Sequence, residues 1–276
     1  MEWWDDLWLN ESFASIMEYI ALDAVHPEWK MWEHYTSSDV LATTSRDIYK
    51  DIQPVGVKVT DPDLIETLFD PGIVYAKGGR LIKMLREFIG EAAFKQGLRE
   101  YFEQYMYGNA TRNNLWECLS RSSGQDIASL MTPWLEKPGM PILSVSFGKK
   151  GLELTQKRFL LDGEDGTSIW PVPLLSADLK QPILFKKQQG IIHTNTKGYF
   201  IINDQSSGHY FVQYRDKAYK NFVVQRFIEK SISTESRINI LNDIYMLSRI
   251  GTISIVDGLD IIAKAQNEDR DSVWIL

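Results

Sequence analysis

The sequence predicts a multidomain chain of α and β structure that is helical at both ends and carries a small β region between them. The prediction rests on the spacing of hydrophobic residues, which changes twice. Apolar residues recur at steps of three and four up to about residue 138, alternate from about 139 to 215, and return to helical steps from about 216. The breaker cluster Lys137-Pro138-Gly139-Met140-Pro141 marks the first change. We therefore expect three segments, 1–138, 139–215 and 216–276.

Composition narrows the class of protein. The chain has 276 residues, a length typical of about two domains, and a formal net charge of −7. This charge and the lack of a basic stripe argue against a nucleic-acid partner. No apolar run approaches the roughly 18 residues of a membrane span, and the acidic start lacks the basic region of a signal peptide. The single cysteine, Cys118, excludes an internal disulfide and favours a reducing, cytoplasmic location, and its helical context predicts a buried, unreactive thiol.

The first helix is predicted from Leu9 to about Pro27, because apolar residues recur there at helical steps. On this helix Glu11, Ser15 and Glu18 share one face, since steps of four and seven return to nearly the same angle. A carboxylate beside an apolar stripe needs a cation, a donor or a metal as partner. The alternative is that both glutamates lie on the solvated side and have no specific role.

A further helix is predicted after the start signal Asp70-Pro71 and runs through Leu85. It contains Gly78 and Gly79 side by side, which cost a helix about 1 kcal/mol each relative to alanine. Such a cost suggests close packing of backbones or a special site. Tyr75 lies one turn earlier, and its ordinary role would be that of a half-buried tyrosine with a bonded hydroxyl.

The middle segment predicts a small β-sandwich of seven or eight short strands separated by turns. Strands are expected at 143–147, 152–154, 169–172, 174–177, 183–186, 191–194, 199–203 and 210–214. A carbohydrate-binding sandwich is an open alternative, although no cluster of aromatic residues separates it from plain core packing. His193 and His209 are expected to face solvent or a neighbouring strand, and His26 and His34 to face solvent or cap helices.

Two strings resemble a known family. Trp3-Trp4-Asp5-Asp6-Leu7-Trp8-Leu9-Asn10-Glu11-Ser12-Phe13-Ala14 resembles the segment after the zinc motif of M1-family aminopeptidases, the aminopeptidase N group, and Tyr75-Ala76-Lys77-Gly78 resembles their Tyr-x-Lys-Gly string. The resemblance implies that Glu11 is a zinc ligand and that Glu18 orients a ligand histidine, with a surface salt bridge as the alternative for Glu18. It also implies that Tyr75 donates a hydrogen bond to the oxyanion of the tetrahedral intermediate. Lys77 is expected to serve packing or a salt bridge.

The resemblance covers nearly the whole chain in order. It implies the helical half of a thermolysin-like catalytic domain over 1–138, a β-sandwich domain over 139–215 and the beginning of an α-helical solenoid over 216–276. It implies Zn²⁺ as cofactor, peptides as substrates and hydrolysis of their N-terminal residues as the reaction.

One part of the family pattern is absent from these 276 residues. None of the four histidines stands in a His-Glu-x-x-His string, so two zinc ligands and the general base are missing. We therefore expect a piece of such an enzyme, beginning just after its metal-binding helix and inactive alone. The alternative is a non-catalytic scaffold or interaction module. The face of the first helix that would pack on the metal-binding helix is expected to expose apolar residues and to favour self-association or complementation by another chain.

Overall fold

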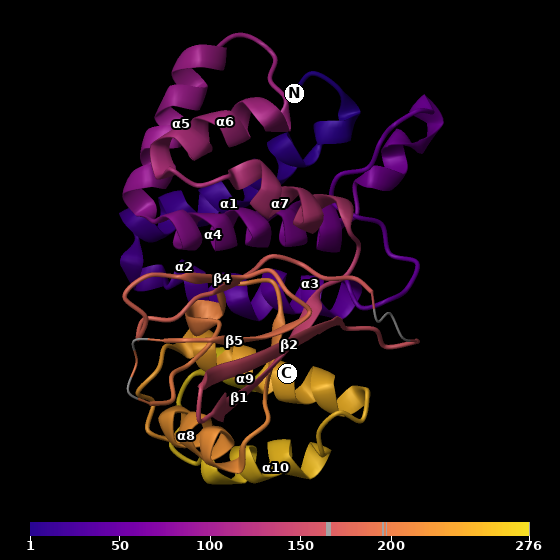
Figure 1. The fold of residues 1–276 in the computed structure, drawn as a ribbon. Coiled ribbons are helices and arrows are strands. Elements are labelled where there is room, and N and C mark those ends of the chain that lie inside the picture. The colour runs from indigo at the N-terminus through magenta and orange to yellow at the C-terminus, as the bar shows by residue number, and fades with distance from the viewer. Residues whose placement is uncertain (164–166, 195, 197, 276) are drawn as a thin grey trace.

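The computed structural model describes residues 1–163, 167–194, 196 and 198–275. Figure 1 shows helices α1 and α4–α7 at one end of the molecule, and the larger sheet with helices α8–α10 at the other. The helices are α1 (Trp8–Val25), α2 (Met31–Tyr35), α3 (Leu41–Arg46), α4 (Gly78–Ile89), α5 (Glu91–Tyr105), α6 (Arg112–Ser123), α7 (Ile127–Glu136), α8 (Lys217–Ile228), α9 (Thr234–Arg249) and α10 (Ile255–Lys264). Within the described residues, no helix combines the length and apolar character needed to cross a membrane.

The predicted helix around Tyr75 differs from expectation in its first two turns. Asp70 caps its start by accepting a hydrogen bond from the Gly72 amide, as its Asp-Pro signal predicts. However, Pro71–Lys77 forms a π-helical segment, and the α-helical winding of α4 begins only at Gly78. Apolar spacing does not distinguish a short π-helical turn from an α-helical one. π-helical turns are rare in proteins overall, but those that do occur are often found at functional sites.

The β region contains fewer strands than predicted. Its six described strands are β1 (Pro141–Gly148), β2 (Gly151–Arg158), β3 (Val172–Leu174), β4 (Ile183–Phe185), β5 (Gln189–Ile192) and β6 (Phe211–Tyr214). They form a four-stranded sheet of order β5-β2-β1-β6 and a two-stranded sheet of β3 and β4. β1 pairs antiparallel with β2 and parallel with β6. The structure thus has a helical part and two small sheets, and the sandwich description stays a prediction.

The expected strand at 199–203 is wrong, and side-chain hydrogen bonds explain why. Asn203 adopts a left-handed backbone conformation with φ of 61°, and its side-chain amide donates to the carbonyls of Gly208 and Tyr210. The amide of Ile202 donates to the Tyr214 hydroxyl at 3.0 Å. These bonds use backbone groups that a strand ladder would need, so the segment folds as a buried loop.

Buried residues join all three expected segments. One hydrophobic cluster contains Ile48 from the first segment, Met140, Ile142, Phe159 and Phe211 from the second, and Met246 and Leu247 from α9. Because these side chains are buried against one another, the three segments pack into one body. The boundaries at 138 and 215 stay predictions.

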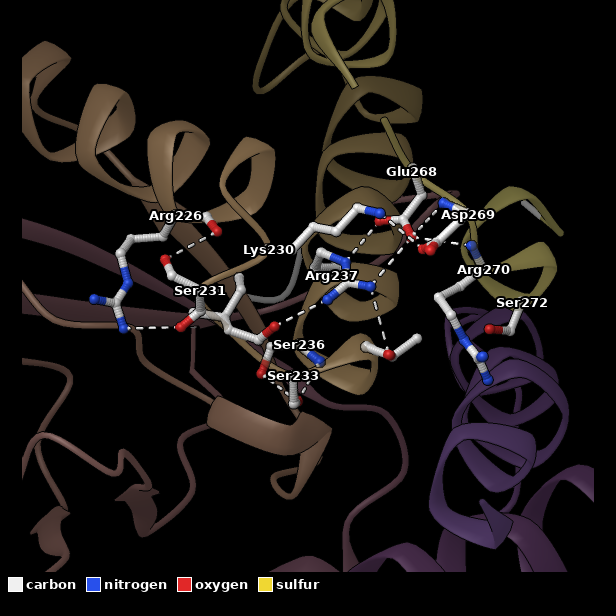
Figure 2. A network of polar contacts seen from close by, with 12 residues as sticks. Arg226, Lys230, Ser231, Ser233, Ser236, Arg237, Glu268, Asp269, Arg270 and Ser272 are labelled. Atoms are coloured by element: carbon white, nitrogen blue, oxygen red, sulfur yellow. Dashed lines mark hydrogen bonds and ion pairs between the residues drawn. The ribbon is translucent and has the colours of Figure 1, made fainter. Parts of the chain in front are cut away.

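Ion pairs fasten the chain that follows α10 to the rest of the molecule. Figure 2 shows Arg237 on α9 facing Glu268, with Lys230, Asp269, Arg270 and Ser272 beside them. Arg237 Nε lies 2.7 Å from Glu268 Oε2, and the two side chains are only 5% and 2% exposed. Arg270 Nη2 lies 2.8 Å from Glu33 Oε2, which connects this segment to α2. Arginine bound to carboxylate through two hydrogen bonds is among the stronger polar contacts in proteins.

Candidate functional site

The predicted site residues Glu11 and Tyr75 are carried by two packed helices. Helix α1 lies against α4 and against the π-helical segment that precedes it. Ser12 Oγ donates a hydrogen bond to the carbonyl oxygen of Val74 at 2.6 Å. Ser12 directly follows Glu11, and Val74 directly precedes Tyr75. This hydrogen bond therefore aligns the two segments next to the two candidate site residues.

The adjacent glycines allow this close approach. A Cβ built on Gly78 would overlap Ser12 Oγ, and one built on Gly79 would lie 3.7 Å from the Ser12 carbonyl oxygen. Any side chain at position 78 would therefore push α1 away from α4. The sequence-based expectation of close backbone packing at this glycine pair is confirmed.

Tyr75 and Glu11 interact directly. Both side chains are half-buried. Burial raises the pKa of the Tyr75 phenol, and a hydrogen bond to the Glu11 carboxylate together with its negative charge raises that pKa further. A tyrosine phenol is protonated at neutral pH, and this shift favours the protonated, hydrogen-bond-donating form further. The structure thus brings together two residues 64 positions apart in the sequence.

Glu18 lies apart from this pair. It is exposed on α1, and the described part of the chain gives it no hydrogen bond and no ion pair. None of the hydrogen bonds and ion pairs of the described residues joins Glu18 to a histidine: His26 stacks on Trp29, and His34 is exposed on α2. The position of Glu18 on the same helix face as Glu11 agrees with the sequence, but its role stays a prediction.

The residues present do not form a complete zinc site. Among the described residues, no group of three or more histidine, cysteine, aspartate or glutamate side chains is arranged to hold a metal ion. Zinc sites in enzymes use three protein ligands and one open position. Glu11 supplies one carboxylate, so it can be at most one ligand of a larger set.

A buried polar cluster next to this site was not anticipated. Lys77, two residues after Tyr75, lies 2.9 Å from Asp47, and both side chains are fully buried. Asp47 also lies 2.8 Å from His209 Nε2 and accepts a hydrogen bond from the Gly139 amide at 2.8 Å. We call Asp47, Lys77 and His209 the buried triad. The expected salt bridge of Lys77 is confirmed, whereas the expectation that His209 faces solvent or a neighbouring strand is wrong.

The charges of the buried triad depend on one another. Burial raises the pKa of Asp47, but the charge of Lys77 and the hydrogen bonds from Lys77 and His209 outweigh it, so this pKa lies below its usual value. Burial lowers the pKa of Lys77, and Asp47 opposes that shift. Burial also lowers the pKa of His209 to about 4 despite the hydrogen bond and charge of Asp47. His209 is therefore neutral at pH 7 and donates its Nε2 proton to Asp47.

Comparisons with known proteins identify the family to which the chain is related. Residues 1–134 match the peptidase family M1 domain. The chain is 38% identical over 277 residues to aminopeptidase N of Lactococcus lactis subsp. cremoris (strain MG1363), covering 98% of this chain and 32% of that protein. It is 33% identical to aminopeptidase N of Lactobacillus helveticus over 96% of this chain and 32% of that protein. It is 32% identical to the alanine/arginine aminopeptidase of Saccharomyces cerevisiae over 99% of this chain and 32% of that protein.

The chain spans about a third of the length of these relatives. The family match covers the helical part that carries Glu11, Tyr75 and Lys77, and the longer alignments continue through the sheets and the C-terminal helices. The identity of about a third over nearly the whole chain, together with the match of residues 1–134 to the family domain, shows that the chain belongs to peptidase family M1.

Proposed function

We propose that this chain supplies part of the active site of an aminopeptidase that removes N-terminal residues from peptides. Glu11 would be one ligand of a zinc ion, and Tyr75 the donor to the developing oxyanion. The observation that carries the proposal is the contact between Glu11 and Tyr75, which the Ser12–Val74 hydrogen bond aligns. A single cysteine that is buried on α6 fits work in the reducing cytoplasm.

Tyr75 suits an oxyanion donor for two reasons. A tyrosine phenol carries its proton at neutral pH, and burial together with Glu11 raises the pKa of this one further. Its side chain is only partly covered, so a bound carbonyl group could approach the hydroxyl. A neutral donor fixed where negative charge develops contributes about 3 kcal/mol to transition-state stabilisation.

The remaining zinc ligands would have to come from outside the described residues. We therefore propose that the 276-residue polypeptide alone has no aminopeptidase activity and binds zinc weakly. The side of α1 that bears Glu18 also exposes the apolar residues Ala14, Met17 and Ala21. We propose this surface as the place where a complementing segment or a second copy would pack, which sedimentation at several concentrations tests.

The assay is a chimera in which this chain replaces the aligned segment of the Lactococcus lactis aminopeptidase N. We expect the folded chimera to bind zinc and to hydrolyse alanine p-nitroanilide, and the isolated chain to bind zinc only weakly and to hydrolyse none of this substrate. Glu11→Gln should remove both zinc and activity. Tyr75→Phe should keep zinc and lower kcat roughly 100- to 1,000-fold.

Two exposed residues provide matched controls, Glu28→Gln and Tyr107→Phe, and both should leave zinc content and kcat unchanged. Full zinc occupancy in Glu11→Gln would reject the ligand role. Turnover by the isolated chain, abolished by Tyr75→Phe, would show that the expected inactivity is wrong. A folded chimera that binds zinc but turns over no substrate would favour the non-catalytic scaffold.

A further inference from the structure

Tyr75 lies between two anchoring points on the π-helical segment. On its N-terminal side, the carbonyl of Val74 accepts the hydrogen bond of Ser12. On its C-terminal side, the Lys77 side chain leaves the segment and enters the buried triad. The phenol itself is the half-exposed side chain between two fixed neighbours.

The anchor at Lys77 brings together groups from three other parts of the chain, near residues 47, 139 and 209. Lys77 Nζ lies 2.9 Å from Asp47 Oδ2, which follows α3, and 3.2 Å from the Gly139 carbonyl oxygen, which precedes β1. His209, just before β6, binds the same Asp47 oxygen. Lys77, Asp47 and His209 are all fully buried, so solvent does not weaken these contacts.

The π-helical winding of Pro71–Lys77 gives the contacts of Lys77 a role. A π-helical turn holds one residue more than an α-helical turn, and it is the less favoured of the two. If the segment rewound as α-helix, its side chains would shift in register by one residue, a rotation of about 100°. Tyr75 would then turn away from Glu11. A contact that fixes Lys77 opposes this rewinding from the C-terminal side.

The chemistry of the anchor also suggests a role beyond stability. Burying an ion pair carries a desolvation cost, and apolar side chains of similar volume are often as stable or more stable. The ion pair and its hydrogen bonds instead fix the geometry of the contact, because each donor and acceptor allows only a few positions for its partner.

We propose that Lys77, Asp47 and His209 are positioning residues that hold Tyr75 against Glu11. The inference rests on the proposed role of Tyr75 and extends it: the β region, through His209, takes part in setting the geometry of a site built on helices. The triad acts through the backbone of the π-helical segment and does not touch the substrate.

The test uses the 276-residue chain with 3-fluorotyrosine at position 75 and records its ¹⁹F resonance at pH 7. The Glu11→Gln variant defines the signal of a phenol that has lost its carboxylate partner. We expect Lys77→Met and Asp47→Asn to move the resonance in the same direction, and His209→Leu to move it less. His209→Gln, whose side-chain amide can still donate to Asp47, should restore the original position.

Lys83→Met is the matched control. Lys83 is also a buried lysine, but it lies on α4, outside the π-helical segment, and binds the Gln205 carbonyl at 2.8 Å. It should lower the melting temperature and leave the resonance in place. Circular dichroism identifies the variants that fold, and the His209 pair keeps the test valid if Lys77→Met unfolds, since it leaves the Lys77–Asp47 contact intact.

The outcomes separate the two proposals. If Glu11→Gln does not move the resonance, the contact between Glu11 and Tyr75 is absent and the proposed function loses its main support. If Glu11→Gln moves it but the folded triad variants do not, the triad is merely structural and only the positioning role is rejected. If the ¹⁹F resonance moves as far in Lys83→Met as in the triad variants, the positioning role is also rejected.

Discussion

Ser12 Oγ and the Val74 carbonyl oxygen are 2.6 Å apart, and this one hydrogen bond joins the helices that carry Glu11 and Tyr75. Both residues are buried, so the bond forms away from competing water. Its position next to both candidate site residues means that a small change in helix packing would be transmitted directly to the site.

Replacing Gly78 by alanine should destabilise the chain by about 1–3 kcal/mol, because the added methyl group overlaps Ser12 Oγ. The cost should be smaller in a Ser12→Gly background, where the overlapping side chain is gone. Chemical denaturation of the two single variants and the double variant gives this coupling energy. Gly90→Ala is a poor control because of its positive φ, whereas Gly163→Ala, with open space around it, should change little. Additive effects of Gly78→Ala and Ser12→Gly would contradict the packing explanation.

Stability should fall as the pH drops from about 6.5 to about 4, because His209 is held neutral in the folded chain. Burial lowers its folded pKa to about 4, below the unfolded value, so the unfolded chain binds the extra proton in this window. The shift corresponds to about 3 kcal/mol of stability that is present near pH 7 and lost on acidification. Denaturation curves at several pH values measure it. His209→Gln should flatten the dependence, and the exposed His193→Gln should not.

The two acidic neighbours Glu268 and Asp269 should differ sharply in importance. Glu268 pairs with Arg237 where both side chains are almost fully covered, whereas Asp269 pairs with Lys230 while 76% exposed. Glu268→Gln should therefore cost about 3 kcal/mol, since it leaves the Arg237 charge buried with a weaker partner. Asp269→Asn should leave the thermal midpoint unchanged. Thermal melts of the two variants, which make the same chemical change at adjacent positions, provide the comparison. Equal losses would show that burial does not decide the value of these pairs.

The Cys118 thiol should be unreactive in the folded chain. It is 1% exposed, and burial raises its pKa despite the nearby Arg121. Its thiolate, the reactive form, is therefore scarce and covered. The native chain should react with a disulfide reagent such as Ellman's reagent roughly 100-fold more slowly than the chain in guanidinium, because reaction requires local opening. Equal rates would indicate that α6 opens readily.

Local patterns in the sequence predicted the parts of the structure that depend on local physics. The apolar spacing located α1, and the Asp70-Pro71 pair located the start of the helix with Tyr75. The glycine pair indicated close packing before any partner was known. The two family strings pointed to Glu11 and Tyr75, which the structure brings together, although their roles in catalysis stay predictions.

The features that sequence reasoning missed depend on contacts between distant residues. Nothing near Asp47 signals that it faces Lys77 and His209, since the partners are 30 and 162 positions away. The one available hint was the place of His209 in front of the apolar strand that became β6, which favours burial. The loop at 199–203 has the apolar composition of a strand, and only the hydrogen bonds from the Asn203 side chain and from the Ile202 amide to the Tyr214 hydroxyl explain why it is not one.

The contact between Asp47 and His209 also constrains the order of events during synthesis. About 130 residues separate Lys77 from His209, which a ribosome adds on the order of ten seconds at typical rates. Until then Asp47 and Lys77 lack the histidine and the sheet that seal them from water. The helical part can form early as a nascent domain, but it reaches its final arrangement around Tyr75 only after the β region has emerged and docked.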